Sequence, residues 1–248
     1  MTPATRPTSS YAPALGAVDL WTSGTPRAGD MKQLLSDAER SRLATIASLT
    51  RFKKGAVIYR AGERADAVFN IVSGVVKAYR PGADSSEHIT AFLFPGDVFG
   101  LSVEGLYANS TKAITPLTAY QLPVSALQSR LLNDAGLEFR VICKLCHELR
   151  EAQRHAFLLS QHRALTKVAM FLQMLEQLQA ARGEPSAEIY LPMARADIGE
   201  YVGMTAAAVS RGFRALAKRG VIMTRDLRHV KIIDRTSFEK LAASYGPS

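Results

Sequence analysis

The sequence is poor in cysteine and has no long hydrophobic run. Only two cysteines, Cys143 and Cys146, occur in 248 residues, so a disulfide framework like that of small secreted proteins is excluded. No stretch of about eighteen uncharged apolar residues is present, which excludes a transmembrane helix. The first residues also lack the apolar run of a secretory signal. We therefore expect a cytoplasmic protein without a membrane partner.

Patterns typical of catalysis and of metal binding are absent as well. The sequence has no glycine-rich phosphate loop, no zinc-spaced set of cysteines and histidines, and no nucleophile elbow. We therefore predict no catalytic residues, no metal site and no enzyme activity. His147, His155 and His162 follow one another at intervals of eight and seven residues. A metal or haem site across a dimer axis is one interpretation, but without further ligands we expect polar or interface histidines.

The two cysteines belong to a short motif. Residues 143–147 match C-x-x-C-H, the attachment motif of c-type haem. A chance match is favoured, because the motif lies within a predicted helix of a protein expected in the cytoplasm. A redox pair is an alternative, since positions three apart share a helix face. Cysteines are, however, most often small buried hydrophobic residues.

Positive charge is in excess and is concentrated near the C-terminus. The chain has 31 Lys and Arg against 22 Asp and Glu, a net charge of +9. Residues 205–235 hold eight Lys and Arg against two Asp, so six of the nine excess charges lie in about one eighth of the chain. A basic segment of this kind favours an anionic partner, provided that the fold gathers it on one face.

The hydropathy pattern first divides into a leader and a β region. Residues 1–30 are rich in Pro, Gly, Ser, Thr and Ala, which predicts a flexible leader. A short helix is predicted from about Ser36, with Glu39 completing a capping box. Residues 31–135 contain short alternating runs separated by glycines, which predict a small antiparallel sandwich or barrel. The predicted strands are Ala56–Tyr59, Val68–Val72, Val75–Tyr79, Ile89–Phe94 and Thr118–Leu122.

A long helix is predicted next, over residues 136–161. Its apolar residues repeat at alternating spacings of three and four over nearly three heptads. The stripe consists of Ile142, Leu145, Leu149, Ala152, Ala156 and Leu159. Packing against the β region would explain an apolar stripe, but a seam this narrow and flanked by charged residues favours contact between two copies of the chain. We therefore predict that these six residues form a homodimer interface.

The remaining residues, 162–248, have the pattern of a winged helix-turn-helix. A helix is predicted over Ala164–Ala181, because Gly183 and Pro185 follow it. Gly199 is the small residue that lets two helices cross closely, and Gly203 supplies a turn position with positive φ. Thr205 is a suitable N-cap for the second helix. A hairpin over residues 221–233 takes the position of the wing.

The second helix of this motif carries a basic outer face, which predicts binding to double-stranded DNA. Its outer face presents Ala207, Ser210, Arg211 and Arg214, with Lys218 at its end. Phosphate contacts are predicted for Thr205, Arg214, Lys218 and Arg228. An αα-hairpin in an ordinary helical domain would explain the glycines but not the basic face. Gly212 counts against the helix, because a mid-helix glycine costs about 1 kcal/mol.

Glycine-marked motifs occur in a fixed order along the chain. In the β region they are Phe52–Gly55, Ile58–Tyr59, Ala61–Glu63, Val68–Phe69, Ile71–Lys77 and Phe94–Gly100; in the C-terminal region they are Asp197–Thr205 and Val209–Arg211. In this order they resemble the CRP/FNR superfamily of bacterial transcription regulators over residues 32–241, with the C-terminal region most similar to the FNR and FixK branch. The resemblance implies an α+β protein with an N-terminal β-roll (a cyclic-nucleotide-binding-like jelly roll), a long dimerisation helix and a C-terminal winged helix-turn-helix.

The sequence departs from this family at the positions that would bind effectors. Cyclic-nucleotide-binding members have a Glu after Phe-Gly and an Arg about ten residues later, and here Leu101 and Ser110 take those positions. A buried cyclic phosphate would be left unpaired, so cAMP is not expected. Oxygen-sensing members bind a 4Fe–4S cluster through N-terminal cysteines, but no cysteine precedes Cys143. No cofactor is therefore predicted, and haem stays an alternative.

The resemblance also implies how DNA is recognised. The branch uses Glu-x-x-Ser-Arg, so the resemblance implies base contacts by Ser210 and Arg211 and at the position of Ala207. Ala207 replaces the Glu that accepts a hydrogen bond from cytosine. A palindrome with half-sites related to TTGA is implied, with a relaxed preference at the base facing Ala207. The expected function is a homodimeric, sequence-specific transcription regulator, and RNA polymerase is an implied partner. The alternative is a small-molecule, gas or haem sensor whose DNA binding requires an effector in the β-roll or dimer-helix region.

Overall fold

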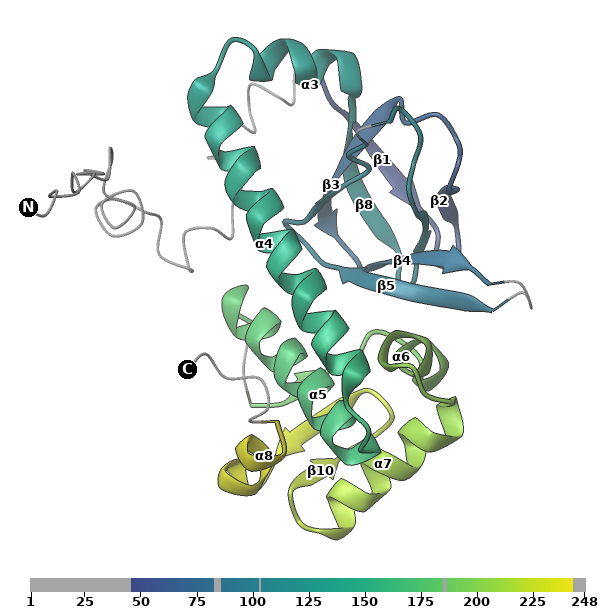
Figure 1. The fold of residues 1–248 in the computed structure, drawn as a ribbon, viewed down its shortest axis with the longest axis vertical. Coiled ribbons are helices and arrows are strands. Elements are labelled where there is room, and N and C mark those ends of the chain that lie inside the picture. Colours follow the sequence, from purple (N-terminus) through teal and green to yellow (C-terminus); the bar gives the residue numbers. More distant parts are fainter. Residues whose placement is uncertain (1–45, 83–85, 103, 185–186, 243–248) are drawn as a thin grey trace, which may run out of the picture. The chain divides into compact units, whose positions relative to one another are not determined.

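The structure is a computed structural model that describes residues 46–82, 86–102, 104–184 and 187–242. The leader predicted over 1–30 and the helix predicted near Ser36 lie outside these residues. In the described part, a β-roll is followed by a long helix and a small helical region with a hairpin (Figure 1).

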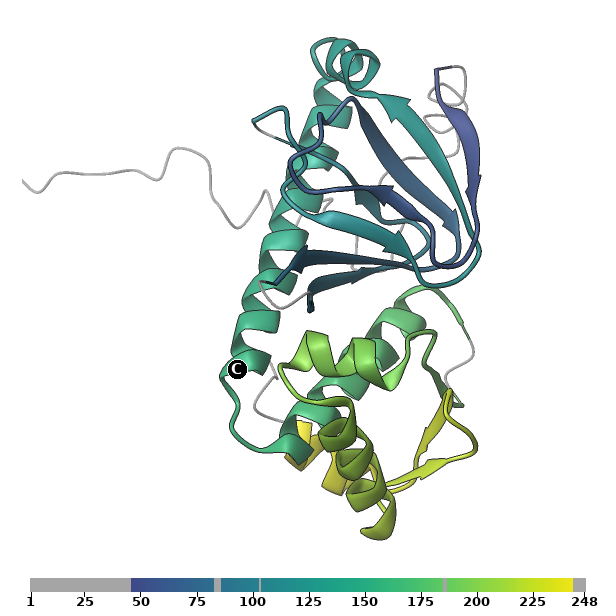
Figure 2. The ribbon, with the colours of Figure 1, turned by 90° about the vertical axis from the view of Figure 1, so that its right-hand side faces the viewer.

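The β-roll consists of two antiparallel four-stranded sheets that face each other (Figure 2). One sheet has the order β1-β8-β3-β6 and the other has the order β2-β7-β4-β5. The strands are β1 (Ser48–Phe52), β2 (Val57–Tyr59), β3 (Ala67–Ser73), β4 (Val76–Pro81), β5 (Glu87–Leu93), β6 (Val98–Phe99), β7 (Ser110–Ala113) and β8 (Leu117–Pro123). Every predicted strand is confirmed within two residues, whereas β1, β6 and β7 were not predicted as separate strands.

A glycine in the β-roll explains one of the sequence motifs. Gly74 has φ +95°, and a Cβ built there would lie 2.3 Å from the carbonyl oxygen of Pro116. Neither the conformation nor the space admits a side chain. The tight connection between β3 and β4 therefore requires glycine at this position.

Helices connect the β-roll to the C-terminal region. α3 (Val124–Leu131) leaves β8, and α4 (Ala135–Ser160) is the long helix that the heptad pattern predicts. Asp134 caps α4, because its Oδ1 accepts a hydrogen bond of 2.9 Å from the Leu137 N–H. α5 (Ala164–Ala181) begins and ends at the predicted residues.

The C-terminal region follows the order of a winged helix-turn-helix. Its elements are β9 (Ile189–Tyr190), α6 (Arg195–Val202), α7 (Ala206–Lys218), β10 (Ile222–Thr224), β11 (His229–Ile232) and α8 (Arg235–Ala242). The hairpin β10–β11 is confirmed, and β9 extends it to a sheet of order β10-β11-β9. The helices pack around fully buried apolar side chains, of which Phe171 and Phe238 are the largest. This core fixes the position of α7.

An ion pair fastens α4 to the β-roll. Lys144 Nζ lies 2.8 Å from Asp97 Oδ1 and 2.8 Å from Glu148 Oε1. The other oxygen of Asp97 accepts a hydrogen bond of 2.9 Å from the Phe94 N–H, so the same carboxylate closes the Pro95-Gly96-Asp97 turn. Burial disfavours the charged form of Lys144, but the two carboxylates outweigh it and raise the pKa of the ammonium group. The face of α4 that carries Lys144 therefore belongs to the β-roll.

Candidate nucleic-acid interface

The turn between α6 and α7 has the geometry that its glycines predict. Gly203 ends α6 in the left-handed conformation, at φ 65° and ψ 49°. A Cβ on Gly199 would lie 2.5 Å from the Met204 carbonyl oxygen, so the chain can turn closely over α6 only at a glycine. The Thr205 hydroxyl accepts a hydrogen bond of 3.1 Å from the Ala208 N–H and caps α7. The predicted roles of these three residues in the turn are confirmed.

The inner face of α7 explains Gly212. The buried residues of this helix are Val209, Gly212, Phe213 and Leu216. A Cβ on Gly212 would lie only 2.9 Å from Val168 Cγ2 of α5. The glycine that weakens the helix by propensity is therefore needed where α7 crosses α5, and the sequence-based objection to this helix does not hold.

The outer face of α7 is basic and exposed. Ala207, Arg211, Arg214 and Lys218 follow one another at spacings of four, three and four, so they share one helix face, and all four are exposed or partly exposed. The three cations form no ion pair within the described residues, and α7 contains no acidic residue. Ser210 lies half-buried at the edge of this face. The structure thus brings the predicted α7 contacts together on one free surface.

Arg228 belongs to the wing and is already engaged. It donates a hydrogen bond of 3.4 Å from Nη1 to the Pro192 carbonyl oxygen and lines a cavity beside the β-roll. Arg225 is also engaged, because its Nη1 lies 3.1 Å from Glu188 Oε2. Lys231 is exposed and has no ion pair within the described part of the chain.

The wing turn itself is closed by Asp226. Its Oδ1 accepts hydrogen bonds from the N–H groups of Arg228 and His229, at 2.6 and 2.8 Å. The bond from the Arg228 N–H and the contact with the His229 ring hold the pKa of Asp226 at about 2. The carboxylate therefore keeps its charge and shapes the wing at any physiological pH.

Two side chains from other helices bind the C-terminal end of α6, and no sequence motif predicted either contact. Lys167 Nζ donates to the Val202 carbonyl oxygen at 2.9 Å, and His155 Nε2 lies 2.7 Å from the Tyr201 carbonyl oxygen. Since a carbonyl only accepts, the proton of the neutral imidazole is on Nε2. The His155 ring also stacks on the Tyr201 ring, with 4.0 Å between the ring centroids.

This environment lowers the pKa of both His155 and Lys167. Burial lowers the pKa of His155, and the nearby Lys167 charge acts in the same direction, against the hydrogen bond to Tyr201. Burial also lowers the pKa of Lys167. The hydrogen bond from Nε2 and the stacking on Tyr201 commit the His155 ring to α6. No group of three potential metal ligands occurs among the described residues.

Arg195, which no sequence motif marks, positions α6 against α7. Its guanidinium carbon lies 3.7 Å from the centroid of the Phe213 ring, so the cation stacks on an aromatic side chain of α7. A motif search does not reveal this contact, because the partners belong to different helices and no fixed spacing relates them.

The predicted dimer stripe is exposed along α4. Ile142, Leu145, Leu149 and Leu159 are between 42 and 61% exposed, and Ala152 is exposed as well. Such a row of large apolar side chains is unusual on a free surface. Cys146 is exposed beside the stripe, Cys143 is half-buried, and both are free thiols.

The two β-roll positions at which family members hold a cyclic nucleotide carry no charged group in this chain. The Ser110 hydroxyl accepts a hydrogen bond of 3.0 Å from the Ala61 N–H, and Leu101 is 40% exposed, so neither family position supplies a charged group. Four aromatic rings pack in this core, with Tyr59 stacked on Tyr107 at 3.6 Å between centroids and Phe69 stacked on Phe99 at 5.2 Å. A buried cyclic phosphate would find no cation at these positions.

No helix in the described ranges has the length and apolar character needed to cross a bilayer.

Known protein families match both halves of the chain. The family model of the cyclic nucleotide-binding domain matches residues 49–134, and that of the Crp-like helix-turn-helix domain matches residues 166–241. The nitrogen fixation regulation protein FixK of Bradyrhizobium diazoefficiens is 31% identical over 214 residues, which cover 85% of this chain and 88% of FixK. The anaerobic regulatory protein of Haemophilus influenzae is 26% identical over 213 residues, which cover 85% and 82% of the two chains.

Solved structures of similar proteins share this fold. FixK2 from Bradyrhizobium japonicum superposes with a TM-score of 0.74 at 30% identity, covering 79% of this chain and 97% of FixK2. A mutant of CooA from Carboxydothermus hydrogenoformans has the same fold, with a TM-score of 0.68 at 19% identity, covering 84% and 92% of the two chains. The chain therefore belongs to the CRP/FNR superfamily of transcription regulators, in the FNR and FixK branch.

Proposed function

We propose that the chain is a homodimeric regulator that recognises a palindromic DNA site by placing α7 in the major groove. The observation that carries this proposal is the outward face of Arg211, Arg214 and Lys218, which no carboxylate neutralises within the described residues. The major groove of B-DNA admits an α-helix, and phosphates attract such a face.

Specific recognition is assigned to the first two turns of α7. Arg211 donates two hydrogen bonds to O6 and N7 of a guanine, and Ser210 bonds an adjacent base or a phosphate. Ala207 is exposed on the same face and offers only a methyl group, so it cannot accept a hydrogen bond from cytosine N4. The family implies a site related to TTGA in each half, and the lost acceptor gives a relaxed preference at the base that faces Ala207.

Phosphates are assigned to the ends of the recognition helix and to the wing. Thr205 binds one through its hydroxyl hydrogen at the N-terminus of α7, where the peptide N–H groups also favour an anion. Arg214 and Lys218 bind phosphates along the groove. Arg228 reaches a phosphate only after giving up its hydrogen bond to Pro192.

Dimerisation is assigned to the exposed stripe of α4. Pairing of two such helices buries the apolar row Ile142, Leu145, Leu149, Ala152, Ala156 and Leu159, and it places two α7 helices about one turn of DNA apart. A symmetric dimer explains the palindrome, because each protomer reads one half-site.

The proposed regulator binds DNA without cAMP or an FNR-type iron–sulfur cluster, and RNA polymerase is the partner that the family implies. The alternative is an effector-gated sensor. Its support is that Tyr201 of α6 lies against both α4 and the β-roll, through His155 and through Phe92 at 5.2 Å between ring centroids. A ligand that moved either part would act on the DNA-binding helices.

Substitution of one recognition residue tests the proposal. We expect Arg211→Gln to lose about 1–3 kcal/mol of affinity for a TTGA palindrome while keeping its affinity for unrelated DNA. Arg51→Gln is the matched control, because Arg51 is exposed on β1 and the substitution removes the same charge. Fluorescence anisotropy with both DNAs is the measurement. Equal losses for the two variants would show that α7 does not read bases.

A further inference from the structure

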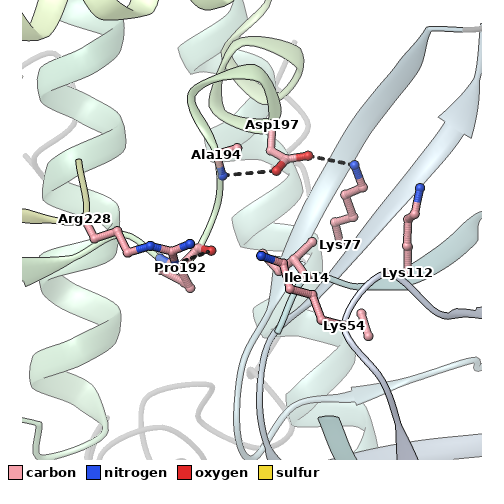
Figure 3. Close-up of a pocket in the computed structure, with 10 residues that line it drawn as sticks. Lys54, Lys77, Lys112, Ile114, Pro192, Ala194, Asp197 and Arg228 are labelled. Atoms are coloured by element: carbon pink, nitrogen blue, oxygen red, sulfur yellow. Dashed lines mark hydrogen bonds and ion pairs between the residues drawn. The ribbon is translucent and has the colours of Figure 1, made fainter. Parts of the chain in front are cut away.

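A cavity lies where the β-roll meets α6 and the wing (Figure 3). Lys54 and Gly55 of the β1–β2 turn, together with side chains of β4 and β7, line one side. Pro192, Ala194, Asp197 and Arg228 line the other. Its volume is about 160 Å³, well below the ~300–1,000 Å³ of pockets for drug-sized ligands. The space suits a small molecule or ion.

The cavity is strongly basic. Lys54, Lys77, Lys112 and Arg228 line it, against the single carboxylate of Asp197. That carboxylate is already used: Oδ1 lies 2.7 Å from Lys77 Nζ, and Oδ2 accepts a hydrogen bond of 3.1 Å from the Ala194 N–H.

A second carboxylate lies next to the cavity and is used as well. Glu87 bridges Lys77 and Lys112, with oxygen-to-nitrogen distances of 2.5 and 3.3 Å. Counting both carboxylates, the cluster keeps two positive charges in excess. The excess belongs to Lys54 and Arg228, since neither forms an ion pair within the described residues.

These two cations approach the cavity from different parts of the fold, Lys54 from the β-roll and Arg228 from the wing (Figure 3). The Arg228 guanidinium has five N–H donors, and the structure records one hydrogen bond from its side chain, the 3.4 Å bond to Pro192. Like charges around one concavity repel each other, and a doubly charged oxyanion removes the repulsion while accepting the free hydrogen bonds. Lysine and arginine together are the usual ligands of such groups.

We propose that this cavity is a binding site for a small doubly charged oxyanion, either orthophosphate or the phosphate group of a small phosphorylated metabolite, held by Lys54 and Arg228. The bound group bridges the β-roll and the wing, and it keeps Arg228 away from DNA. The site is separate from the β-roll interior, and its occupancy does not depend on the DNA sequence that α7 reads.

Calorimetric titration of the full-length protein without DNA, at constant ionic strength, tests the proposal. Orthophosphate and glycerol phosphate are the two probes, and acetate is the singly charged control. We expect saturable binding of at least one phosphate probe and none of acetate; binding of both assigns the shared phosphate group, and binding of glycerol phosphate alone assigns a phosphorylated metabolite.

Variants locate the binding. Lys54→Gln and Arg228→Gln should each weaken it by about tenfold or more. Lys53→Gln and Lys231→Gln are matched controls, because they remove the same charge from exposed neighbours outside the cavity, and they should bind as the parent does.

Three results would overturn the proposal. The first is the absence of saturable phosphate binding, and the second is an equal loss in the Lys53 and Lys54 variants, which would indicate general surface attraction. The third is an unchanged phosphate affinity in both Lys54→Gln and Arg228→Gln, which would place the bound phosphate elsewhere on the protein. Because no DNA is present in the titration, failure here is distinguishable from failure of the proposed DNA recognition.

Discussion

Gly212 shows how one residue reconciles helix propensity with packing. In an isolated helix its replacement by alanine would add about 1 kcal/mol of stability. In this fold the added Cβ would lie 2.9 Å from Val168 Cγ2, closer than side-chain carbons normally approach. Overpacking of this kind costs about 1–3 kcal/mol, so the close crossing of α5 and α7 favours glycine at this position.

A double-mutant cycle measures this crossing. We expect Gly212→Ala to be less favourable in the parent than in a Val168→Ala background, by about 1–3 kcal/mol of unfolding free energy, because the smaller partner removes the clash. Denaturant unfolding of the four proteins gives the coupling. An equal effect of Gly212→Ala in both backgrounds would contradict the close approach of α7 to Val168.

His155 makes stability depend on pH. Its pKa in the folded protein is below the ordinary value of about 6.5, because burial disfavours the imidazolium form. The unfolded chain therefore binds the proton more tightly, and the free energy of unfolding falls as the pH drops below about 6.5 and through the lower folded pKa. Above that range the contribution is fully present.

Unfolding between pH 5 and 8 tests this dependence. The parent should lose stability toward pH 5, and His155→Gln should lose less over the same range. His147→Gln is the control on the same helix and should follow the parent. A steeper loss of stability in His155→Gln than in the parent would contradict the lowered pKa of His155.

At the scale of elements, α4 uses its two faces differently. Lys144 and His155 bind the β-roll and α6, whereas the stripe that includes Leu145 and Leu149 is exposed. An apolar heptad stripe does not say by itself whether it packs within the chain or between chains. Within the described residues its own chain leaves it uncovered, which favours the second copy.

A charge in this stripe should separate the protomers. We expect the parent to sediment as a dimer and Leu149→Glu as a folded monomer, because two carboxylates cannot be buried opposite each other without partners. Leu132→Glu is the control, since Leu132 is 86% exposed and lies outside the stripe. A dimeric Leu149→Glu protein would show that the stripe does not form the dimer interface.

Element boundaries were predictable where local patterns determine them. α5 and the α6–α7 turn follow from periodicity, caps and glycines within a few residues. α3 was missed because it is only eight residues long and has no side-chain N-cap, so the spacing of Val124, Leu127 and Leu131 covers barely two turns. β7 was missed because its first residues, Ser110 and Thr111, are polar although they are buried.

At the scale of the whole molecule, α6 joins the β-roll and α4. The Lys77–Asp197 ion pair connects β4 to α6, and the Tyr201 ring contacts β5 and α4. Burial opposes the charge on Lys77, but Asp197 and Glu87 outweigh it and raise its pKa. These contacts could not be predicted, because Lys77 and Asp197 are 120 positions apart and no repeat or spacing relates them.

Selection from a random DNA library by the purified protein, without added ligand and at near-physiological salt, tests the central claim most directly. The account predicts enrichment of a palindrome with TTGA-related half-sites about one helical turn apart and a relaxed base opposite Ala207. Enrichment of no palindrome would contradict effector-free, sequence-specific recognition by α7. Absence of salt-dependent binding to any DNA would also contradict the assignment of the basic face of α7 to DNA phosphates.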